Sequence, residues 1–293
     1  MSKLIINLLL ILFLAFTTNV FAMEEDAKDT YCLKVGPKGL DRMQFQNKLL
    51  AEDTEEHIGK VGPLEGKKVL DVGCGFGIMS VDLATRVGST GHVYGIDISV
   101  EQLAVAQEKA AALCLKNVTF CQHDVRSLSD FRERDFDVVY IRYVLSHINN
   151  PKDVITGAKA LLKEGGVIAT QDVVVSSFWQ PHQEDIFVEF RELGAKMAEK
   201  TGNDYEIGLR LQELHEEVGF TKVDAYFRQP PLSVADAKKL FLLTVVEGTD
   251  KAIESKMLAP ETLENWQNTM SAWPEEDPLP FHMAKSGYVL AWK

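Results

Sequence analysis

The sequence predicts an α/β protein, a three-layer sandwich in which helices cover both faces of a mostly parallel sheet. From residue 67 onward, apolar runs rich in β-branched residues alternate with helical patterns, and this alternation is typical of βαβ units. The first of these runs leads directly into three closely spaced glycines. Because glycine lets a ligand approach the backbone closely, the two observations together place a ligand site at the end of the first strand.

Five strands are expected in the first part of the sheet, with helical stretches between them. They cover residues 69–72, 92–96, 118–122, 137–141 and 167–175. One helix begins after Ser99, with Gln102 at the spacing of a capping box, and another begins at Pro151, because proline is favoured at the first helical position. A strand over residues 222–227 follows, and residues 287–292 are expected to end the chain as a strand.

Two helical stretches interrupt the later part of this alternation. They lie near residues 176–204 and 233–281, after the fifth and sixth strands. Ligands of α/β sheets bind at the carboxyl ends of the strands. Insertions at these places therefore predict a helical lid over the active edge of the sheet.

Composition and charge limit the class of protein. With 46% hydrophobic and 25% charged residues among 293, the chain has the composition of a globular protein with a large core, and collagen-like, coiled-coil and disordered chains are excluded. The 43 acidic residues outnumber the 31 basic ones and give a net charge of −12. A surface this negative repels phosphate backbones, so a nucleic-acid partner is disfavoured.

The first residues have the pattern of an export signal. Lys3 precedes an apolar run over residues 4–16, and Val20 and Ala22 occupy the two positions that a signal peptidase requires. We therefore expect residues 1–22 to be a signal peptide, which predicts an exported protein, periplasmic or secreted, with no stable membrane anchor after cleavage. The alternative is an uncleaved membrane anchor, although the apolar run is shorter than an ordinary membrane-spanning helix.

The three glycines lie in the run VLDVGCGFG, at positions 73, 75 and 77. Their spacing differs from that of a dinucleotide fingerprint, because Ile78 stands where the third glycine is required, and no Gly-Lys-Ser/Thr follows for a phosphate loop. Asp71 ends the strand beside this loop. It would repel a pyrophosphate and stabilise a ligand that carries an ammonium and a sulfonium group, as S-adenosylmethionine does.

Two further acids follow the next two strands. Asp97 ends the second strand, at the distance at which one βαβ unit returns a carboxylate to the hydroxyls of a ribose. Asp124 ends the third strand, where a carboxylate can accept a hydrogen bond from an adenine amino group. The three acids form a consistent nucleoside site, although each alone is equally explained as a turn residue at the end of a strand.

These motifs resemble those of the class I S-adenosylmethionine-dependent methyltransferases, in particular the subgroup that acts on small molecules, quinones and lipids. The resemblance rests on VLDVGCGFG, on GID and HDV, and on FDVVYIRYVLSHI and LLKEGGVI. It implies a Rossmann-like, seven-stranded sheet over residues 67–293 with the last strand antiparallel. The stretch YCLKVGPKGLDRMQFQ is also similar to the lid of this subgroup, which implies an N-terminal helical lid over residues 23–66.

The resemblance also implies which residues bind S-adenosylmethionine. Gly73 and Gly75 would line its methionine moiety beside Asp71, and Arg142 would offer its backbone carbonyl to the amino group. The other residues expected at the cofactor are Asp97 and Ile98 for the ribose, Asp124 and Val125 for the adenine, and Gln102.

Methyl transfer from a sulfonium mainly requires proximity and a dry pocket, and it requires a general base only when the acceptor loses a proton. His147, shortly after the fourth strand, is the candidate base, and the alternative is that it fixes its loop through backbone contacts. Near the fifth strand, Asp172 alone is a candidate ligand for magnesium, so no metal is expected. The sequence thus predicts a methyltransferase acting on a small, partly apolar molecule. The rival is an exported cofactor-binding or interaction protein with the same fold and no catalysis.

Overall fold

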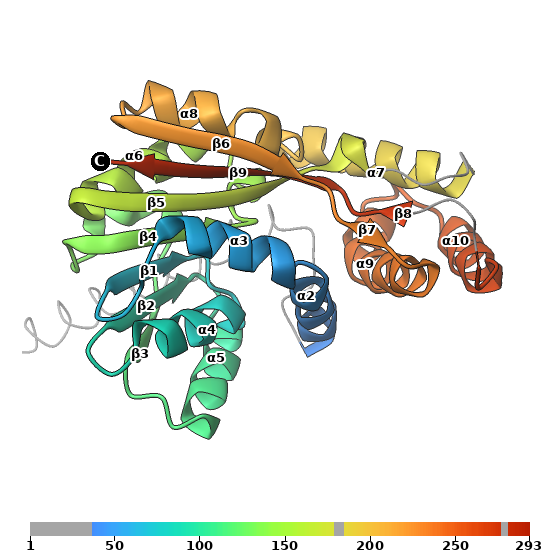
Figure 1. Ribbon diagram of the computed structural model, residues 1–293. Coiled ribbons are helices and arrows are strands. Elements are labelled where there is room, and N and C mark those ends of the chain that lie inside the picture. The colour runs from blue at the N-terminus through green and yellow to red at the C-terminus, as the bar shows by residue number, and fades with distance from the viewer. Residues whose placement is uncertain (1–36, 179–184, 277–280) are drawn as a thin grey trace, which may run out of the picture.

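A computed structural model of the chain describes residues 37–178, 185–276 and 281–293 and contains the expected sheet. Seven strands are arranged in the order β3-β2-β1-β4-β5-β9-β6 (Figure 1). Strands β1 to β5 pair in parallel, whereas β9 is antiparallel to both of its neighbours, which confirms the predicted fold class. The strands are β1 (Lys68–Val72), β2 (His92–Asp97), β3 (Val118–Gln122), β4 (Phe136–Arg142), β5 (Leu162–Val174), β6 (Lys222–Arg228) and β9 (Lys285–Trp292).

Helices cover both faces of the sheet (Figure 1). Val69 and Leu70 are adjacent in β1 and both are fully buried, on opposite faces, because successive side chains of a strand alternate. Leu70 packs in one apolar cluster with residues of α6 and α8, whereas Val69 packs in another with residues of α3 and α4. The helices against the sheet are α3 (Ala51–Val61), α4 (Ile78–Val87), α5 (Val100–Ala112), α6 (Pro151–Leu161) and α8 (Leu211–Glu217).

A second group of helices lies beyond the end of the sheet toward which the parallel strands point (Figure 1). These helices share a separate apolar cluster, in which Phe187, Trp266 and Phe281 are almost completely buried. The group includes helices from both stretches in which the sequence predicts insertions, together with α2 from the N-terminal part. Its elements are α2 (Pro37–Leu49), α7 (Asp185–Thr201), α9 (Val234–Glu254), α10 (Pro260–Ala272), β7 (Pro231–Leu232) and β8 (Phe281–His282).

The expected signal peptide, residues 1–22, and the first part of the expected lid lie outside the described residues. In the described part of that lid, α3 packs against the sheet, and α2 packs against α9. In the described ranges, no helix is both long enough and apolar enough to cross a membrane.

Strand β5 begins at Leu162, earlier than the Val167 that the sequence predicts. Leu162 is buried, and it pairs with Phe136 of β4 before the register of the two strands shifts. The residues between Leu162 and Val167 therefore bulge from the ladder, with Gly165 in the left-handed conformation at φ 71°. Gly165 and Gly166 both lie inside this bulge.

Gly77 has a conformation and surroundings that require glycine where the chain enters α4. Its φ is 66°, and a Cβ would lie 2.6 Å from the Cβ of Ala106 and 3.0 Å from the ring of Phe120. We expect Gly77→Ala to lower the free energy of unfolding by roughly 2–5 kcal/mol, the sum of about 1–2 for backbone strain and about 1–3 for overpacking. Urea denaturation measures the loss.

Gly165→Ala is the matched control for this variant. Gly165 has a similar φ of 71°, but no atom lies within 4 Å of the position that a Cβ would occupy there. Gly165→Ala should therefore lower the free energy of unfolding by about 1–2 kcal/mol, through backbone strain alone. Equal losses in the two variants would contradict the close packing around Gly77.

Candidate active site

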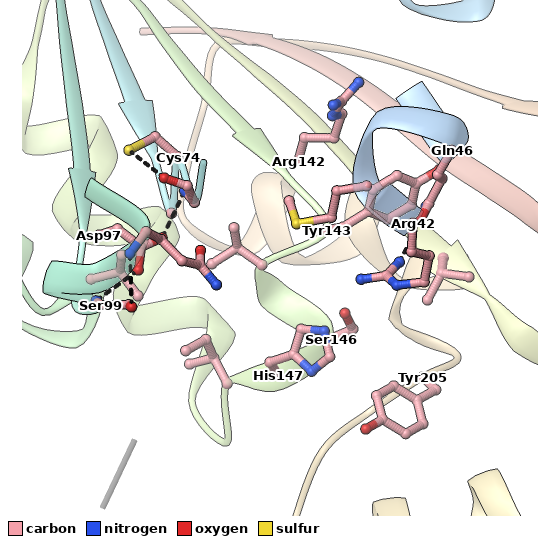
Figure 2. Close-up of a pocket in the computed structure, with 18 of the residues that line it drawn as sticks. Arg42, Gln46, Cys74, Asp97, Ser99, Arg142, Tyr143, Ser146, His147 and Tyr205 are labelled. Atoms are coloured by element: carbon pink, nitrogen blue, oxygen red, sulfur yellow. Dashed lines mark hydrogen bonds between the residues drawn. The ribbon is translucent and has the colours of Figure 1, made fainter. Parts of the chain in front are cut away.

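A cavity of about 710 Å³ opens at the carboxyl ends of the parallel strands, and its volume is in the range of small-molecule sites. Its wall contains the ends of β1, β2 and β4 and residues of α2, α7 and α9. In Figure 2, Cys74, Asp97 and Ser99 lie at one end of the cavity, and His147 and Tyr205 lie at the other. We call these the glycine-loop end and the His147 end.

Gly73 and Gly75 line the glycine-loop end, and both positions require glycine. Gly73 has φ 67°, and a Cβ there would lie 2.5 Å from the side chain of Val144. Gly75 has φ 53°, and its Cβ would lie 2.9 Å from Gln102 and 3.3 Å from Met43. The loop is therefore packed against three separate segments, which are the turn after β4, helix α5 and the lid helix α2.

Asp97 ends β2 and holds the glycine loop in place. Its Oδ2 accepts a hydrogen bond from the backbone N–H of Gly75 at 2.8 Å, and its Oδ1 accepts one from that of Ser99 at 2.9 Å. Burial raises the pKa of Asp97, and these backbone hydrogen bonds oppose the rise. The acid that is expected to bind the ribose thus also positions the loop that is expected to line the methionine moiety.

Asp71 is buried beside the glycine loop, with 3% of its surface exposed. The hydroxyl of Ser80 donates a hydrogen bond to its Oδ2 at 2.6 Å. Burial raises the pKa of Asp71 to about 6, and the hydrogen bond from Ser80 and the positive charge of Arg142 oppose this rise. The carboxyl group is therefore mostly ionised at pH 7, and it presents a negative charge to the cavity.

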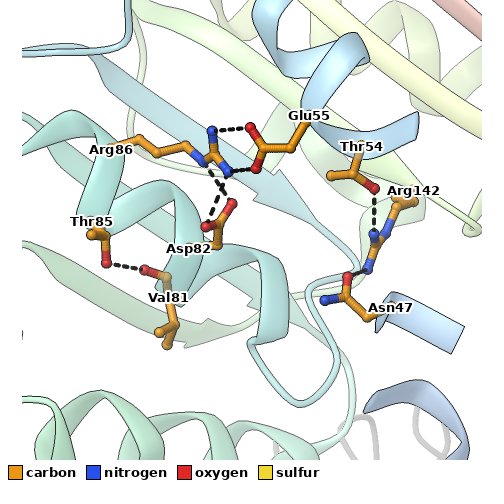
Figure 3. A network of polar contacts seen from close by, with 8 residues as sticks. All are labelled: Asn47, Thr54, Glu55, Val81, Asp82, Thr85, Arg86 and Arg142. Atoms are coloured by element: carbon orange, nitrogen blue, oxygen red, sulfur yellow. Dashed lines mark hydrogen bonds and ion pairs between the residues drawn. The ribbon is translucent and has the colours of Figure 1, made fainter. Parts of the chain in front are cut away.

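Arg142 is the last residue of β4, and its side chain contacts the N-terminal helices (Figure 3). Its Nη2 donates to Oδ1 of Asn47 at 2.9 Å, and its Nη1 donates to Oγ1 of Thr54 at 3.4 Å. The sequence predicts a role for its backbone carbonyl, and the structure adds that its guanidinium joins β4 to α2 and α3. Arg86 joins α4 to α3 in a similar way, through Glu55 (Figure 3).

Asp124 caps the short 3-10 helix η1 (Val125–Asp130). Its Oδ1 accepts a hydrogen bond from the backbone N–H of Arg126 at 2.9 Å, and its Oδ2 pairs with the guanidinium of Arg126 at 2.7 Å. Arg126 itself lines the cavity, so the acid expected at the adenine is accompanied by an arginine that the sequence does not single out. The remaining expected cofactor residues that line the cavity are Ile98, Gln102 and Val125.

His147 ends the 3-10 helix η2 (Leu145–His147) and lines the cavity. Its ring packs edge-on against Tyr205, with 5.7 Å between the ring centroids. Burial, and to a lesser degree the positive charge of Arg42, lower the pKa of His147 to about 4. The imidazole is therefore neutral at pH 7 and has a nitrogen that can accept a proton. Its role as a general base stays a prediction.

The turn that carries His147 is attached to β5 through Asp172. Oδ2 of Asp172 accepts a hydrogen bond from the backbone N–H of Ser146 at 3.1 Å, and burial raises the pKa of Asp172 to about 6. Asp172, the residue considered as a magnesium ligand, thus accepts a hydrogen bond from the backbone. In the part of the chain that the structure describes, no three His, Cys, Asp or Glu side chains are grouped so as to hold a metal ion.

Most residues of the His147 end come from segments far apart in the sequence, and sequence reasoning missed them. Arg42 belongs to α2, Tyr205 follows α7, and Met283 follows β8. Helical periodicity indicates the lid helices, but it does not distinguish a side chain in the lid core from one that faces a cavity. Phe190 lines the cavity, whereas Phe187 of the same helix is buried in the core.

The strand order, the antiparallel β9 and the glycine loop with acids at the ends of β1 to β3 define the class I S-adenosylmethionine-dependent methyltransferase fold. A family model described as a methyltransferase domain matches residues 63–219, which is more than half of the chain. The chain belongs to this family of methyltransferase domains.

Relatives among curated proteins include the ubiquinone biosynthesis O-methyltransferases of Paracidovorax citrulli and Actinobacillus pleuropneumoniae. They are 36% and 40% identical to this chain over 109 and 112 residues. Each match covers 37% of this chain, and 44% and 47% of the respective relative. The chain therefore spans less than half the length of these relatives.

Solved structures share the fold at low sequence identity. Phosphoethanolamine N-methyltransferase 2 of Haemonchus contortus, solved with S-adenosyl-L-methionine, has a TM-score of 0.51 and 19% identity, and the likeness covers 84% of this chain and 52% of that one. A structure from Bacillus halodurans assigned to the methyltransferases has a TM-score of 0.55 and 18% identity, over 83% of this chain and 99% of that one. At these identities the likeness extends to the fold alone.

The neutral state of His147 is testable by titration. We expect its ring resonances to show no titration between pH 8 and about 5, because burial disfavours the charged ring and holds its pKa near 4. Nuclear magnetic resonance of histidine-labelled protein follows the chemical shifts of the ring resonances with pH. The resonances that disappear in His147→Asn are those of His147. A midpoint near the ordinary histidine value of about 6.5 would show a solvated ring and contradict this site geometry.

Proposed function

We propose that the protein transfers a methyl group from S-adenosylmethionine to a small, partly apolar molecule. The observation that carries the proposal is one cavity whose two ends differ in chemistry. Carboxylates and a glycine loop lie at one end, and a neutral histidine lies among apolar side chains at the other. Membership of the methyltransferase family supports the type of reaction, and the relatives, which are named as O-methyltransferases of ubiquinone biosynthesis, support a small-molecule acceptor.

The glycine-loop end has the groups that the cofactor requires. Asp71 supplies a buried negative charge for an ammonium or sulfonium group, and the loop at Gly73 lets a ligand approach the backbone. Asp97 and Asp124 present carboxylate oxygens, which accept hydrogen bonds from hydroxyl and amino donors. When bound, S-adenosylmethionine supplies an electrophilic methyl group on a positively charged sulfur.

The His147 end has the groups that an acceptor requires. Apolar side chains exclude water and hold an apolar molecule in a fixed position, which is the main contribution that a protein makes to this type of transfer. The neutral ring of His147 can take the proton of an acceptor whose reacting atom carries one. The apolar side chains that line the cavity and belong to the apolar cluster of the lid helices are Leu50, Phe190, Leu193, Met197 and Met283.

Calorimetry with S-adenosylhomocysteine tests the cofactor site. We expect S-adenosylmethionine and S-adenosylhomocysteine to bind, and NAD⁺ not to bind, because its pyrophosphate would face the carboxylate of Asp71. Asp97→Asn should weaken S-adenosylhomocysteine binding at least about a hundredfold, since two hydrogen bonds to a charged group contribute roughly 1.5–3 kcal/mol each.

Asp130→Asn is the control for this experiment, because Asp130 is exposed at the end of η1. It should bind S-adenosylhomocysteine as the wild type does, and circular dichroism checks that both variants are folded. Wild-type affinity in a folded Asp97→Asn variant would remove Asp97 from the cofactor site. Tight binding of NAD⁺ would overturn the proposed function.

We also propose that residues 1–22 direct export of the protein. The proposal is supported by Lys3, by the apolar run over residues 4–16 and by the small residue Ala22 at the expected cleavage position. Export would place the mature protein outside the cytosol, where its cofactor has to be supplied by the compartment or cell that receives it.

N-terminal sequencing tests the export proposal. When the full chain is expressed in a bacterium, the mature protein should begin at Met23 and appear outside the cytosol. Ala22→Arg should leave an uncleaved precursor at the membrane, because signal peptidases require a small residue there. Recovery of the uncleaved wild-type chain in the soluble cytosolic fraction would show that the segment is not an export signal.

A further inference from the structure

Three arginines line the cavity. Arg126 pairs with Asp124, and the other two act at opposite ends of the cavity. The positive charge of Arg142 acts on Asp71 at the glycine-loop end, whereas that of Arg42 acts on His147. In Figure 2, Arg42 lies on the side of His147 and Tyr205, across the cavity from Asp97. The side chain of Arg142 is bonded to α2 and α3, whereas Arg42 has no role in the proposed binding of the cofactor.

Arg42 is fixed by two side chains and lines the cavity. Its Nε donates to Oε2 of Glu247 in α9 at 2.6 Å, and its Nη1 donates to Oε1 of Gln46 at 2.7 Å. Only 7% of the surface of Arg42 and 2% of that of Glu247 are exposed. Nη2 has no hydrogen-bond partner among the described residues. A guanidinium has five N–H groups, so donors remain on Arg42 for a ligand in the cavity.

At the His147 end the imidazole is neutral, and Arg42 presents a positive charge to the cavity beside its partner Glu247. Charges interact strongly in a cavity of low dielectric constant, so a ligand that brings one negative charge is favoured there.

We propose that Arg42 binds a carboxylate of the methyl acceptor, so that the acceptor is a small organic acid with an apolar body. This inference rests on the proposed function, because it takes the His147 end to be the acceptor site. A guanidinium matches a carboxylate through parallel N–H groups, and Glu247 orients it before the ligand binds. Arg42 is then a residue that determines specificity, and the apolar side chains bind the rest of the acceptor.

Matched pairs of acids and amides test the proposal without knowledge of the natural acceptor. The probes are 3-phenylpropionate with 3-phenylpropionamide and hexanoate with hexanamide, each titrated into full-length protein saturated with S-adenosylhomocysteine or S-adenosylmethionine. We expect each acid to bind at least about tenfold more tightly than its amide, because the carboxylate forms charge-assisted hydrogen bonds. The preference should be larger with S-adenosylmethionine, which carries the positive sulfur.

Variants of the Arg42–Glu247 ion pair test whether Arg42 causes the preference for acids over amides. Arg42→Gln alone removes the guanidinium from the buried carboxylate of Glu247 and threatens folding, so it is combined with Glu247→Gln, which removes both charges. The double variant should lose the preference for acids and keep its affinity for S-adenosylhomocysteine within about threefold. Arg42→Lys keeps the charge without the planar guanidinium and should lose part of the preference. Arg134→Gln, at an exposed arginine, is the control and should keep all of it.

The outcomes separate this inference from the proposed function. If the wild type does not bind S-adenosylhomocysteine, the proposed function fails. If it binds S-adenosylhomocysteine but binds acids and amides equally, or binds no acid at millimolar concentration, only the inference about Arg42 is overturned. A double variant that keeps the acid preference would overturn it as well. A double variant that loses S-adenosylhomocysteine binding would also overturn the inference, because Arg42 would then bind the carboxylate of the cofactor's methionine.

Discussion

The hydrogen bond from the backbone of Gly75 to Asp97 is the contact on which the cavity depends. A loop with three glycines loses much conformational entropy when it is ordered, and it therefore needs a fixed partner. Asp97 supplies that partner from the end of β2, and it connects the loop to the start of α5 through Ser99. Once the loop is fixed, its bare backbone forms one wall of the cavity, and Val144 and Gln102 pack where larger side chains would lie.

Burial of ionisable groups is the second constraint, and it differs between the two ends of the cavity. Asp71 and Asp97 are carboxyl groups whose pKa is raised by burial, and each is stabilised by hydrogen bonds from Ser80 or from the backbone. His147 is a base whose pKa is lowered by burial, so it stays neutral. One end of the cavity therefore favours a cation and the other end favours a polar group among apolar walls. Shifts of this kind are concentrated at functional sites.

The sequence predicts the sheet and the glycine-loop end because both are determined locally. The period of the apolar runs gives the strands, and acids that follow successive parallel strands must meet at one edge. The predicted start of β5 was wrong, because Leu162 is buried against Phe136 and the strand therefore begins before the bulge at Gly165. Arg42 and Tyr205 could not be predicted, because they reach His147 only through the packing of α2 and the turn after α7, which no local pattern specifies.

Helix α2 connects the two ends of the cavity. Met43 of this helix contacts the loop at Gly75, Asn47 accepts a hydrogen bond from Arg142, and Arg42 lies at the His147 end and pairs with Glu247 of α9. Adjacent residues of one helix thus form the cover of the glycine loop and one wall of the other end. Because a helix moves as a rigid unit, displacement of α2 would open the cofactor site and remove the guanidinium from the His147 end at the same time. The proposed acceptor site is therefore complete only while α2 covers the glycine loop.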